Sequence, residues 1–202
     1  MEKQRVLFIG NSITRHAPAP DIGWHGDWGM AASCEEKDYV HVMMRSFEKA
    51  GIPAEYHVKN IAGWERSFWE RDLEELREQR EFDATIIILR VTENVDEKEA
   101  AARIFGSYYD ELIRFLNPGG KALVVCSNGF GEHPVVNHQI EAVARMHGYP
   151  LADLSALWFN DENKALDKFE HEGVRAHPSD TGMETIANIL FSHVMWEMGK
   201  RA

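Results

Sequence analysis

The hydrophobic positions of this chain fall into short apolar runs that alternate with longer segments in which apolar residues recur at helical spacing. Five runs have the length of buried strands, and they lie at residues 5–9, 54–58, 84–89, 121–126 and 150–153. Between the third and fourth runs, one face of a predicted helix carries Ala101, Ile104, Phe105, Tyr108, Leu112 and Phe115. This alternation predicts a parallel sheet with helices on both faces, in which right-handed crossovers bring the strand ends together along one edge.

The length of the chain favours one domain over residues 1–202. We expect a three-layer α/β/α sandwich of flavodoxin-like architecture with a mostly parallel, five-stranded sheet. One connection is longer than a minimal βαβ unit needs, because residues 14–38 separate the first strand from a helix that begins near Asp38. Structureless connections of that length are uncommon unless they are functional. This inserted loop is therefore expected to lie beside the functional site.

The first apolar run breaks directly into Gly10-Asn11-Ser12. A buried strand that ends in a turn of small residues presents a hydroxyl at the carboxyl edge of the sheet, where open α/β folds bind ligands. Ser12 is therefore a candidate nucleophile. A serine in such a turn is more often a local hydrogen-bonding residue, so the turn by itself does not establish catalysis.

A candidate general base lies near the other end of the chain, where His177 precedes Pro178 and a helical pattern follows. The proline disfavours the α conformation for the residue before it, which places His177 in the loop that leads into the helix. Such a loop can carry a general base. The alternative is that Ser179 or Asp180 caps the helix and His177 is a solvated loop residue.

With these two segments in place, the chain resembles the SGNH, or GDSL-type, hydrolase family. Residues 10–13 are similar to the family's first block, which carries the nucleophilic serine, and residues 177–180 are similar to the last, which carries the catalytic histidine. Residues 60–63 follow the second apolar run and resemble the glycine block. Residues 92–94 follow the third run and resemble the Gly-x-Asn block. The four blocks occur in the family's order and span nearly the whole chain.

The resemblance implies a serine esterase of the SGNH fold. In that family the histidine, here His177, removes the proton of the serine, here Ser12. The backbone N–H groups of Ser12 and Gly63 and the side chain of Asn94 would form the oxyanion hole. The implied substrates are small acyl esters, acetyl or short-chain and including those of carbohydrates, and the implied chemistry needs no cofactor.

Two positions depart from the family pattern. Thr92 replaces the usual glycine, and Val174 occupies the place of the aspartate three residues before the histidine. Glu172 is the predicted acid of the triad, displaced by an insertion. Alternatively, a backbone carbonyl near Val174 orients His177, which fixes the tautomer but stabilises imidazolium less than a carboxylate does.

The same departures leave two other functions open. The chain could be a degenerate relative that binds a carbohydrate or small ligand without hydrolysis. It could also be a flavodoxin-like domain with no site at Ser12. Ser127, after the fourth apolar run, is a rival nucleophile by position, but it has no matching histidine block.

Substrate contacts are predicted from residues near these blocks. In the inserted loop, tryptophan rings could offer apolar contact or a sugar-stacking platform, and polar side chains could donate or accept hydrogen bonds. The predicted contact residues are Trp24, His25, Asp27, Trp28, Trp64 and Arg90. The alternative for the two loop tryptophans is that they anchor the loop to the rest of the protein, since buried aromatic residues are common in cores.

Composition narrows the function classes. A net charge of −11 without a basic cluster argues against nucleic-acid binding. No apolar stretch reaches the length of a membrane span, and the first strand begins almost at Met1, so we expect a cytoplasmic protein without a signal peptide. The ten histidines lack the spacing of metal ligands, and no metal is expected. The expected partner is a small-molecule ester, and the oligomeric state stays open.

Overall fold

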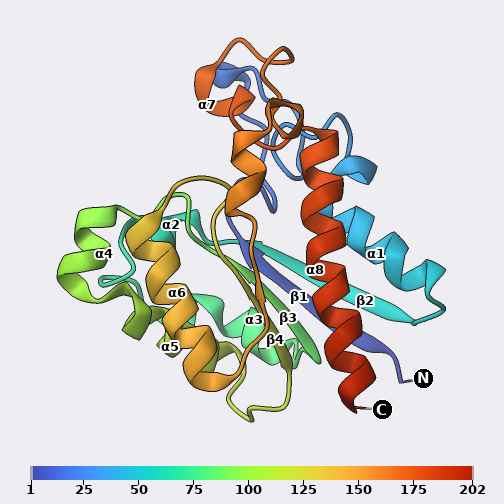
Figure 1. Cartoon of the computed structure of the whole chain (residues 1–202), viewed down its shortest axis with the longest axis vertical. Coiled ribbons are helices and arrows are strands. Elements are labelled where there is room, and N and C mark those ends of the chain that lie inside the picture. Colours follow the sequence, from blue (N-terminus) through green and yellow to red (C-terminus); the bar gives the residue numbers. More distant parts are fainter. Residues whose placement is uncertain (1, 202) are drawn as a thin grey trace.

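The computed structural model describes residues 2–201, and its centre is a five-stranded parallel sheet (Figure 1). The strands run in the order β2-β1-β3-β4-β5, all parallel to their neighbours. Their bounds are Gln4–Gly10 for β1, Ala54–Asn60 for β2, Ile86–Arg90 for β3, Leu123–Ser127 for β4 and Leu151–Ala152 for β5. All five predicted strands are confirmed.

Alternate residues of β1 face two separate cores. Val6 and Phe8 belong to the core that is covered by α1 (Tyr39–Lys49) and α8 (Asp180–Arg201). Leu7 and Ile9 belong to the core that is covered by α5 (Phe105–Leu116) and α6 (Pro134–His147). Figure 1 shows these helices on opposite sides of the sheet. The predicted three-layer α/β/α sandwich is confirmed, and cover on both faces explains why the central strands β3 and β4 are buried along their whole length.

The local sequence explains where α1 begins. Asp38 caps α1, because its side chain accepts a hydrogen bond from the backbone N–H of His41 at 2.8 Å.

Three further short helices are α2 (Ala62–Arg66), α3 (Arg77–Glu81) and α7 (Glu172–Arg175). Single 3₁₀ turns lie at Pro20–Ile22, Glu35–Lys37, Leu73–Leu76, Ser155–Phe159 and Asp161–Asn163.

The helix predicted around residues 101–115 is two helices. α4 (Glu97–Arg103) ends at Ile104, whose φ of 56° is left-handed, and α5 begins at the next residue. The Ile104 side chain is 64% exposed, whereas Phe105 is fully buried. The change of direction brings Phe105 into the core at the cost of a β-branched residue in a disfavoured conformation.

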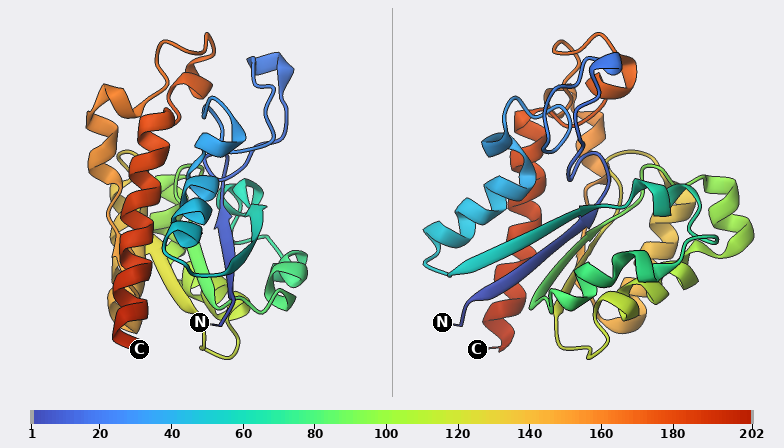
Figure 2. Two further views of the ribbon diagram at one scale, coloured as in Figure 1. Left: turned by 90° about the vertical axis from the view of Figure 1, so that its right-hand side faces the viewer. Right: turned by 180° about the vertical axis from the view of Figure 1, so that it is seen from behind.

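Two segments far apart in the sequence form a lobe above the carboxyl ends of the strands. This lobe comprises residues 14–37 and 160–178, which lie side by side at the top of both views in Figure 2. Trp24 packs against Phe169 with ring centroids 6.1 Å apart, and Val174 shares the same small core. Residues 14–37 have regular structure of their own, since His16 pairs with Trp28 and Ala19 with Trp24 as in an antiparallel ribbon.

The order of the strands places a switch point between β1 and β3. The chain leaves β1 for β2 on one side and later enters β3 on the other, so segments after β1 and β3 meet at one edge. Gly10 ends β1 where there is no room for a side chain: a Cβ there would lie 2.0 Å from Thr14 Oγ1 and 2.8 Å from the Arg90 carbonyl oxygen.

Of the helices in residues 2–201, none has the length and apolarity required to span a membrane.

Candidate active site

Ser12 and His177 meet at the switch point. Ser12 Oγ lies 2.7 Å from His177 Nε2, although the two residues are 165 positions apart in the sequence. The Asn11 carbonyl accepts hydrogen bonds from the N–H groups of Thr14 at 2.9 Å and Arg15 at 3.0 Å, which closes the turn that carries Ser12. His177 is held by its own backbone, whose N–H donates to the Val174 carbonyl at 3.0 Å.

The second ring nitrogen of His177 faces a backbone carbonyl. Nδ1 lies 2.6 Å from the Gly173 oxygen, and because a carbonyl can only accept, Nδ1 carries the proton. Nε2 is then free to accept the proton of the Ser12 hydroxyl. Burial lowers the pKa of His177, an effect that the Gly173 carbonyl and the charge of Glu93 partly oppose, so the ring is neutral at neutral pH.

This geometry contradicts the prediction that Glu172 is the acid of the triad. Glu172 begins α7, its side chain is 90% exposed, and its nearest charged partner is Arg175 at 3.6 Å. The α7 turn directs this carboxylate to solvent and brings the Gly173 carbonyl under the imidazole instead. The arrangement is the alternative in which a backbone carbonyl orients His177.

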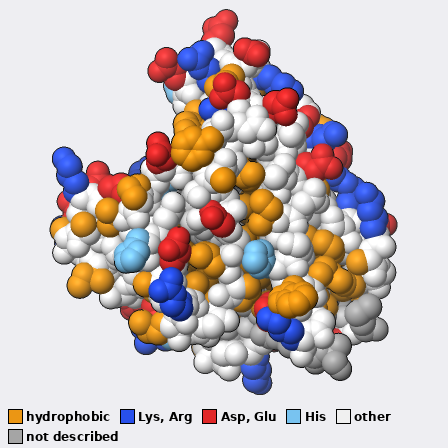
Figure 3. Space-filling model, in the orientation of Figure 1, with side chains coloured by type: hydrophobic (Ala, Val, Ile, Leu, Met, Phe, Trp, Pro, Cys, Tyr) orange, Lys and Arg blue, Asp and Glu red, His pale blue; other side chains and the backbone are white. Residues whose placement is uncertain are grey.

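A cavity of about 420 Å³ opens beside the Ser12 hydroxyl. Its lining includes the segment before α6 and the ring of Trp158, which packs edge-on against Phe130 of that segment with ring centroids 5.8 Å apart. The Lys164 ammonium lies 4.7 Å from the centre of the Trp158 ring. The lining residues are Ser12, Ile13, Glu93, Asn94, Phe130, Gly131, Glu132, His133, Trp158, Gly173, Ala176 and His177. Figure 3 shows the surface hollowed where the lobe meets the body of the protein.

The structure places two of the three predicted oxyanion donors at this cavity. Asn94 lines it beside Ser12, and the Ser12 backbone N–H has no hydrogen-bond partner within residues 2–201. Gly63 is the second residue of α2, where N–H groups lack intrahelical partners. The Ile61 N–H donates to the Gly10 carbonyl at 2.6 Å, which ties the start of α2 to the end of β1. Gly63 itself lines a neighbouring hollow, and its role stays a prediction.

Solved structures share this architecture. Neither a protein-family model nor a curated protein matches the sequence. The structure is similar to the esterase EstA from Pseudoalteromonas sp., with a TM-score of 0.61, 7% identity and coverage of 97% of this chain and 99% of that chain. It is similar to the acetyl xylan esterase AlAXEase, with a TM-score of 0.57, 20% identity and coverage of 94% and 99%. It is also similar to a protein of Parabacteroides merdae assigned as a GDSL-like lipase, with a TM-score of 0.60, 14% identity and coverage of 94% of both chains.

The chain has the SGNH hydrolase fold. The resemblance inferred from the four sequence blocks is thus confirmed at the level of the fold. At identities of 7–20%, the roles of residues in these structures cannot be transferred to this chain. Any role for Ser12, His177 and Asn94 must therefore be argued from the geometry of this chain.

Beneath the Ser12 turn, the SGNH fold of this chain holds a buried charged network. Glu93 accepts hydrogen bonds from the Asn11 amide at 2.6 Å and the Phe130 N–H at 2.7 Å, and it pairs with the guanidinium of Arg90. Burial opposes ionisation of Glu93, but Arg90 and these donors outweigh it and lower its pKa. Glu65, fully buried on α2, accepts from the Asn11 and Asn94 amides.

Sequence reasoning missed several of these residues. Glu65 and Glu93 received no role, because no spacing rule marks a carboxylate that is buried beneath a turn. The cavity walls at residues 130–133 and at Trp158 were also missed. They follow β4 and β5, so the rule that ligands bind outside the carboxyl ends of strands could have indicated them.

None of the six predicted contact residues lines the Ser12–His177 cavity. Trp24 is 2% exposed and its indole donates to the His16 carbonyl at 3.0 Å, while the Trp28 indole donates to Ala32 at 3.0 Å. These rings anchor the loop, which was the alternative interpretation. His25 and Asp27 are exposed, and Asp27 pairs with Arg15 at 2.7 Å.

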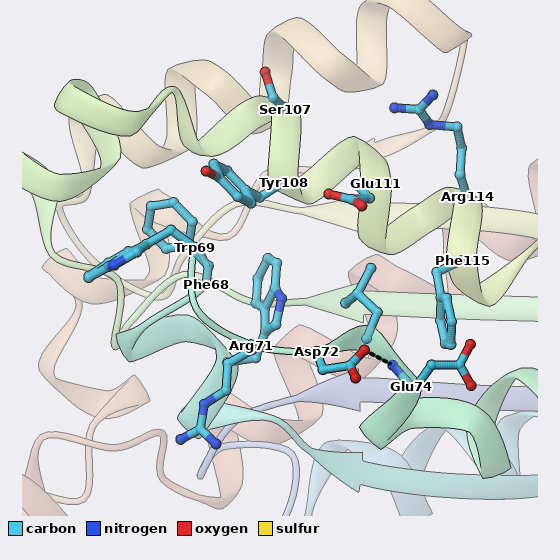
Figure 4. A pocket seen from close by; sticks show the side chains of 12 residues that line it. Phe68, Trp69, Arg71, Asp72, Glu74, Ser107, Tyr108, Glu111, Arg114 and Phe115 are labelled. Atoms are coloured by element: carbon cyan, nitrogen blue, oxygen red, sulfur yellow. Dashed lines mark hydrogen bonds between the residues drawn. The ribbon is translucent and has the colours of Figure 1, made fainter.

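The remaining two predicted contacts and the rival nucleophile are buried. Arg90 is 1% exposed and turned toward Glu93. Trp64 is 6% exposed and borders a different groove of about 850 Å³ between residues 64–74 and α5 (Figure 4). That groove contains neither catalytic candidate, and the guanidinium of Arg103 covers the Trp69 ring at 4.2 Å. The Ser127 side chain is fully buried, which removes it as a nucleophile.

Proposed function

We propose that this protein is a serine esterase that hydrolyses small acyl esters, acetyl or short-chain. The observation that carries the proposal is the 2.7 Å contact between Ser12 Oγ and His177 Nε2, made while Nδ1 donates to the Gly173 carbonyl at 2.6 Å. A serine within hydrogen-bonding reach of a neutral, oriented imidazole is the arrangement that activates a hydroxyl for nucleophilic attack.

The first half of the reaction transfers the acyl group to the protein. His177 Nε2 removes the Ser12 proton as Oγ attacks the ester carbonyl, and the tetrahedral oxyanion accepts hydrogen bonds from the Ser12 and Gly63 N–H groups and the Asn94 amide. The imidazolium then gives its proton to the leaving alkoxide, which departs as the alcohol. In the second half, His177 takes a proton from water, hydroxide attacks the acyl-enzyme, and the returned proton releases the acid and Ser12.

The carbonyl at Nδ1 makes this a dyad. The Gly173 oxygen fixes the tautomer, but a neutral acceptor stabilises the imidazolium less than a carboxylate does. Glu93 supplies part of the missing charge, because its field raises the pKa of His177 against the effect of burial. The carboxylate that assists the base therefore acts from the sheet side of the site and not from the usual position at Nδ1.

The cavity supports a small substrate. A volume of about 420 Å³ with one aromatic wall accommodates an acetyl or short acyl group together with an alcohol of about the size of a sugar. The similarity to an acetyl xylan esterase supports including acetylated carbohydrates among the candidates. The alternative is a ligand-binding protein of the same fold without turnover, and reactivity of Ser12 distinguishes the two.

A serine-reactive fluorophosphonate, with intact-mass detection, tests the proposal alongside hydrolysis of 4-nitrophenyl acetate. The wild type should gain one adduct and hydrolyse the ester, and Ser12→Ala should lose both properties while keeping its fold. Ser127→Ala is the matched control and should leave labelling and hydrolysis unchanged, because that serine is buried at the last position of β4. An adduct on Ser12→Ala would move the nucleophile elsewhere, and absence of labelling in the wild type would favour the ligand-binding alternative.

A further inference from the structure

The proposed steps leave one buried carboxylate of the site unused. Glu65 is fully buried on α2, two residues after Gly63. Its Oε1 accepts a hydrogen bond from the Asn11 amide at 2.9 Å and another from the Thr92 N–H, and its Oε2 accepts from Asn94 Nδ2 at 2.6 Å. A buried charge is costly unless donors satisfy it, and here three donors do so.

Each of these contacts belongs to a segment that carries an oxyanion donor. Asn11 directly precedes Ser12, Asn94 is itself a donor candidate, and Glu65 shares α2 with Gly63. The three segments come from different parts of the chain and follow β1, β2 and β3. Among the described residues, the Glu65 side chain hydrogen-bonds both the turn of Ser12 and the side chain of Asn94.

We propose that Glu65 is the positioning residue of the oxyanion hole. Its carboxylate holds the three donor segments in register and fixes the Asn94 amide, so that the second N–H of that amide is available to the cavity. Arg66 completes the orientation, since its guanidinium donates to Asn94 Oδ1 at 3.0 Å. The inference rests on the esterase function proposed above for its kinetic consequences, but the geometry of the Asn94 amide can be tested without turnover.

The positioning role requires the ionised carboxylate. A protonated carboxyl would place a donor against one of the N–H groups that now donate to it. The charged groups around Glu65 are Glu93 after β3, which shares the Asn11 amide, Arg90 in β3, which pairs with Glu93, and Arg66 on its own helix. Burial and the neighbouring Glu93 raise the pKa of Glu65 to about 7.

Protonation of Glu65 should lower kcat. Below about pH 7 Glu65 is protonated and the oxyanion hole loses its arrangement, so kcat should fall as the pH decreases through that value. Burial lowers the pKa of His177 from its ordinary value, so His177 becomes protonated at a lower pH than Glu65 does. The acidic limb of the wild-type profile should therefore lie near pH 7, and it should move to lower pH when Glu65 can no longer titrate.

Glu65→Gln is the variant that tests the proposal, because its amide keeps the size of the side chain but sets an NH₂ group against a donor. We expect kcat to fall by about 10²- to 10³-fold, as for loss of one oxyanion donor, with KM within about threefold of the wild type. Combining it with Asn94→Ala should cost less than the sum of the two single changes, because both disturb the Asn94 amide. Asp110→Asn is the control and should leave kcat unchanged, because that half-buried carboxylate pairs with His147 at 3.0 Å between α5 and α6, outside the proposed site.

A second readout does not depend on catalysis. The side-chain amide resonances of Asn94, assigned by their loss in Asn94→Ala, should titrate with a midpoint near pH 7 in the wild type and stay constant in Glu65→Gln. This result is expected even if the protein proves not to be an esterase. A wild-type Asn94 amide that does not titrate, or a folded Glu65→Gln with wild-type kcat, would overturn the proposal. If Glu65→Gln does not fold, the wild-type titration decides.

Discussion

At the scale of single residues, the site depends on which group faces each nitrogen of His177. The Gly173 carbonyl occupies the position at Nδ1 where a triad would have a carboxylate, and the charge of Glu93 raises the pKa of His177 against the effect of burial. The backbone of α7 therefore orients His177, the proposed base, and the side chain of Glu172, the acid that the sequence predicted, faces solvent.

Glu172→Gln is expected to leave kcat and KM within about twofold of the wild type. Its side chain is 90% exposed, and within residues 2–201 its charged partner is Arg175 at 3.6 Å; exposed pairs of this kind contribute little. Steady-state hydrolysis of 4-nitrophenyl acetate measures the effect, with His177→Ala as the reference for loss of the base. A decrease in kcat by orders of magnitude would show that Glu172 swings onto Nδ1 when substrate binds.

At the scale of secondary-structure elements, the sequence predicted what local pattern determines. Ser12 and His177 were identified because a turn follows a buried strand and a proline follows a loop histidine. Glu172 was misplaced because nothing in the local pattern marks the four-residue helix that turns it outward. The pattern also did not indicate the break at Ile104, because the helical spacing of apolar residues continues through this position although its backbone has a left-handed φ of 56°.

This break gives a prediction about stability. Ile104→Gly should raise the free energy of unfolding by up to about 1 kcal/mol, because glycine adopts left-handed φ without the cost that a β-branched residue incurs. Little burial is lost, since the side chain is 64% exposed. Urea denaturation compares the variant with Ile104→Ala, which keeps a Cβ and should gain much less. Equal stabilities for the two variants would show that the left-handed backbone at this position carries no strain.

At the scale of the whole molecule, the proposed catalytic pair joins two structural parts. Ser12 is fixed to the sheet at the end of β1, whereas His177 belongs to the lobe of residues 14–37 and 160–178. The lobe has a small core of its own, separate from the two cores that flank the sheet. The contact between Ser12 and His177 therefore depends on how the lobe packs, which no local pattern in the sequence specified.

Trp24→Ala should loosen this lobe while the sheet stays intact. Trp24 is 2% exposed, lies 5.6 Å from Trp28 and 6.1 Å from Phe169 between ring centroids, and packs in the core that includes Val174, three residues before His177. Removing a buried tryptophan lowers the free energy of unfolding by about 3–5 kcal/mol. A core as small as that of the lobe is expected to unfold locally after such a loss.

In Trp24→Ala, hydrogen exchange measured by mass spectrometry should increase in both segments of the lobe and stay at wild-type levels in β1, β3 and β4. The kcat should decrease, although Ser12 and His177 are both still present. Trp196→Ala is the control, because that ring is 68% exposed on α8 and its loss should change neither measurement. If exchange in the strands increased as much as in the lobe, the lobe would unfold together with the sheet, and His177 would be positioned by the fold as a whole.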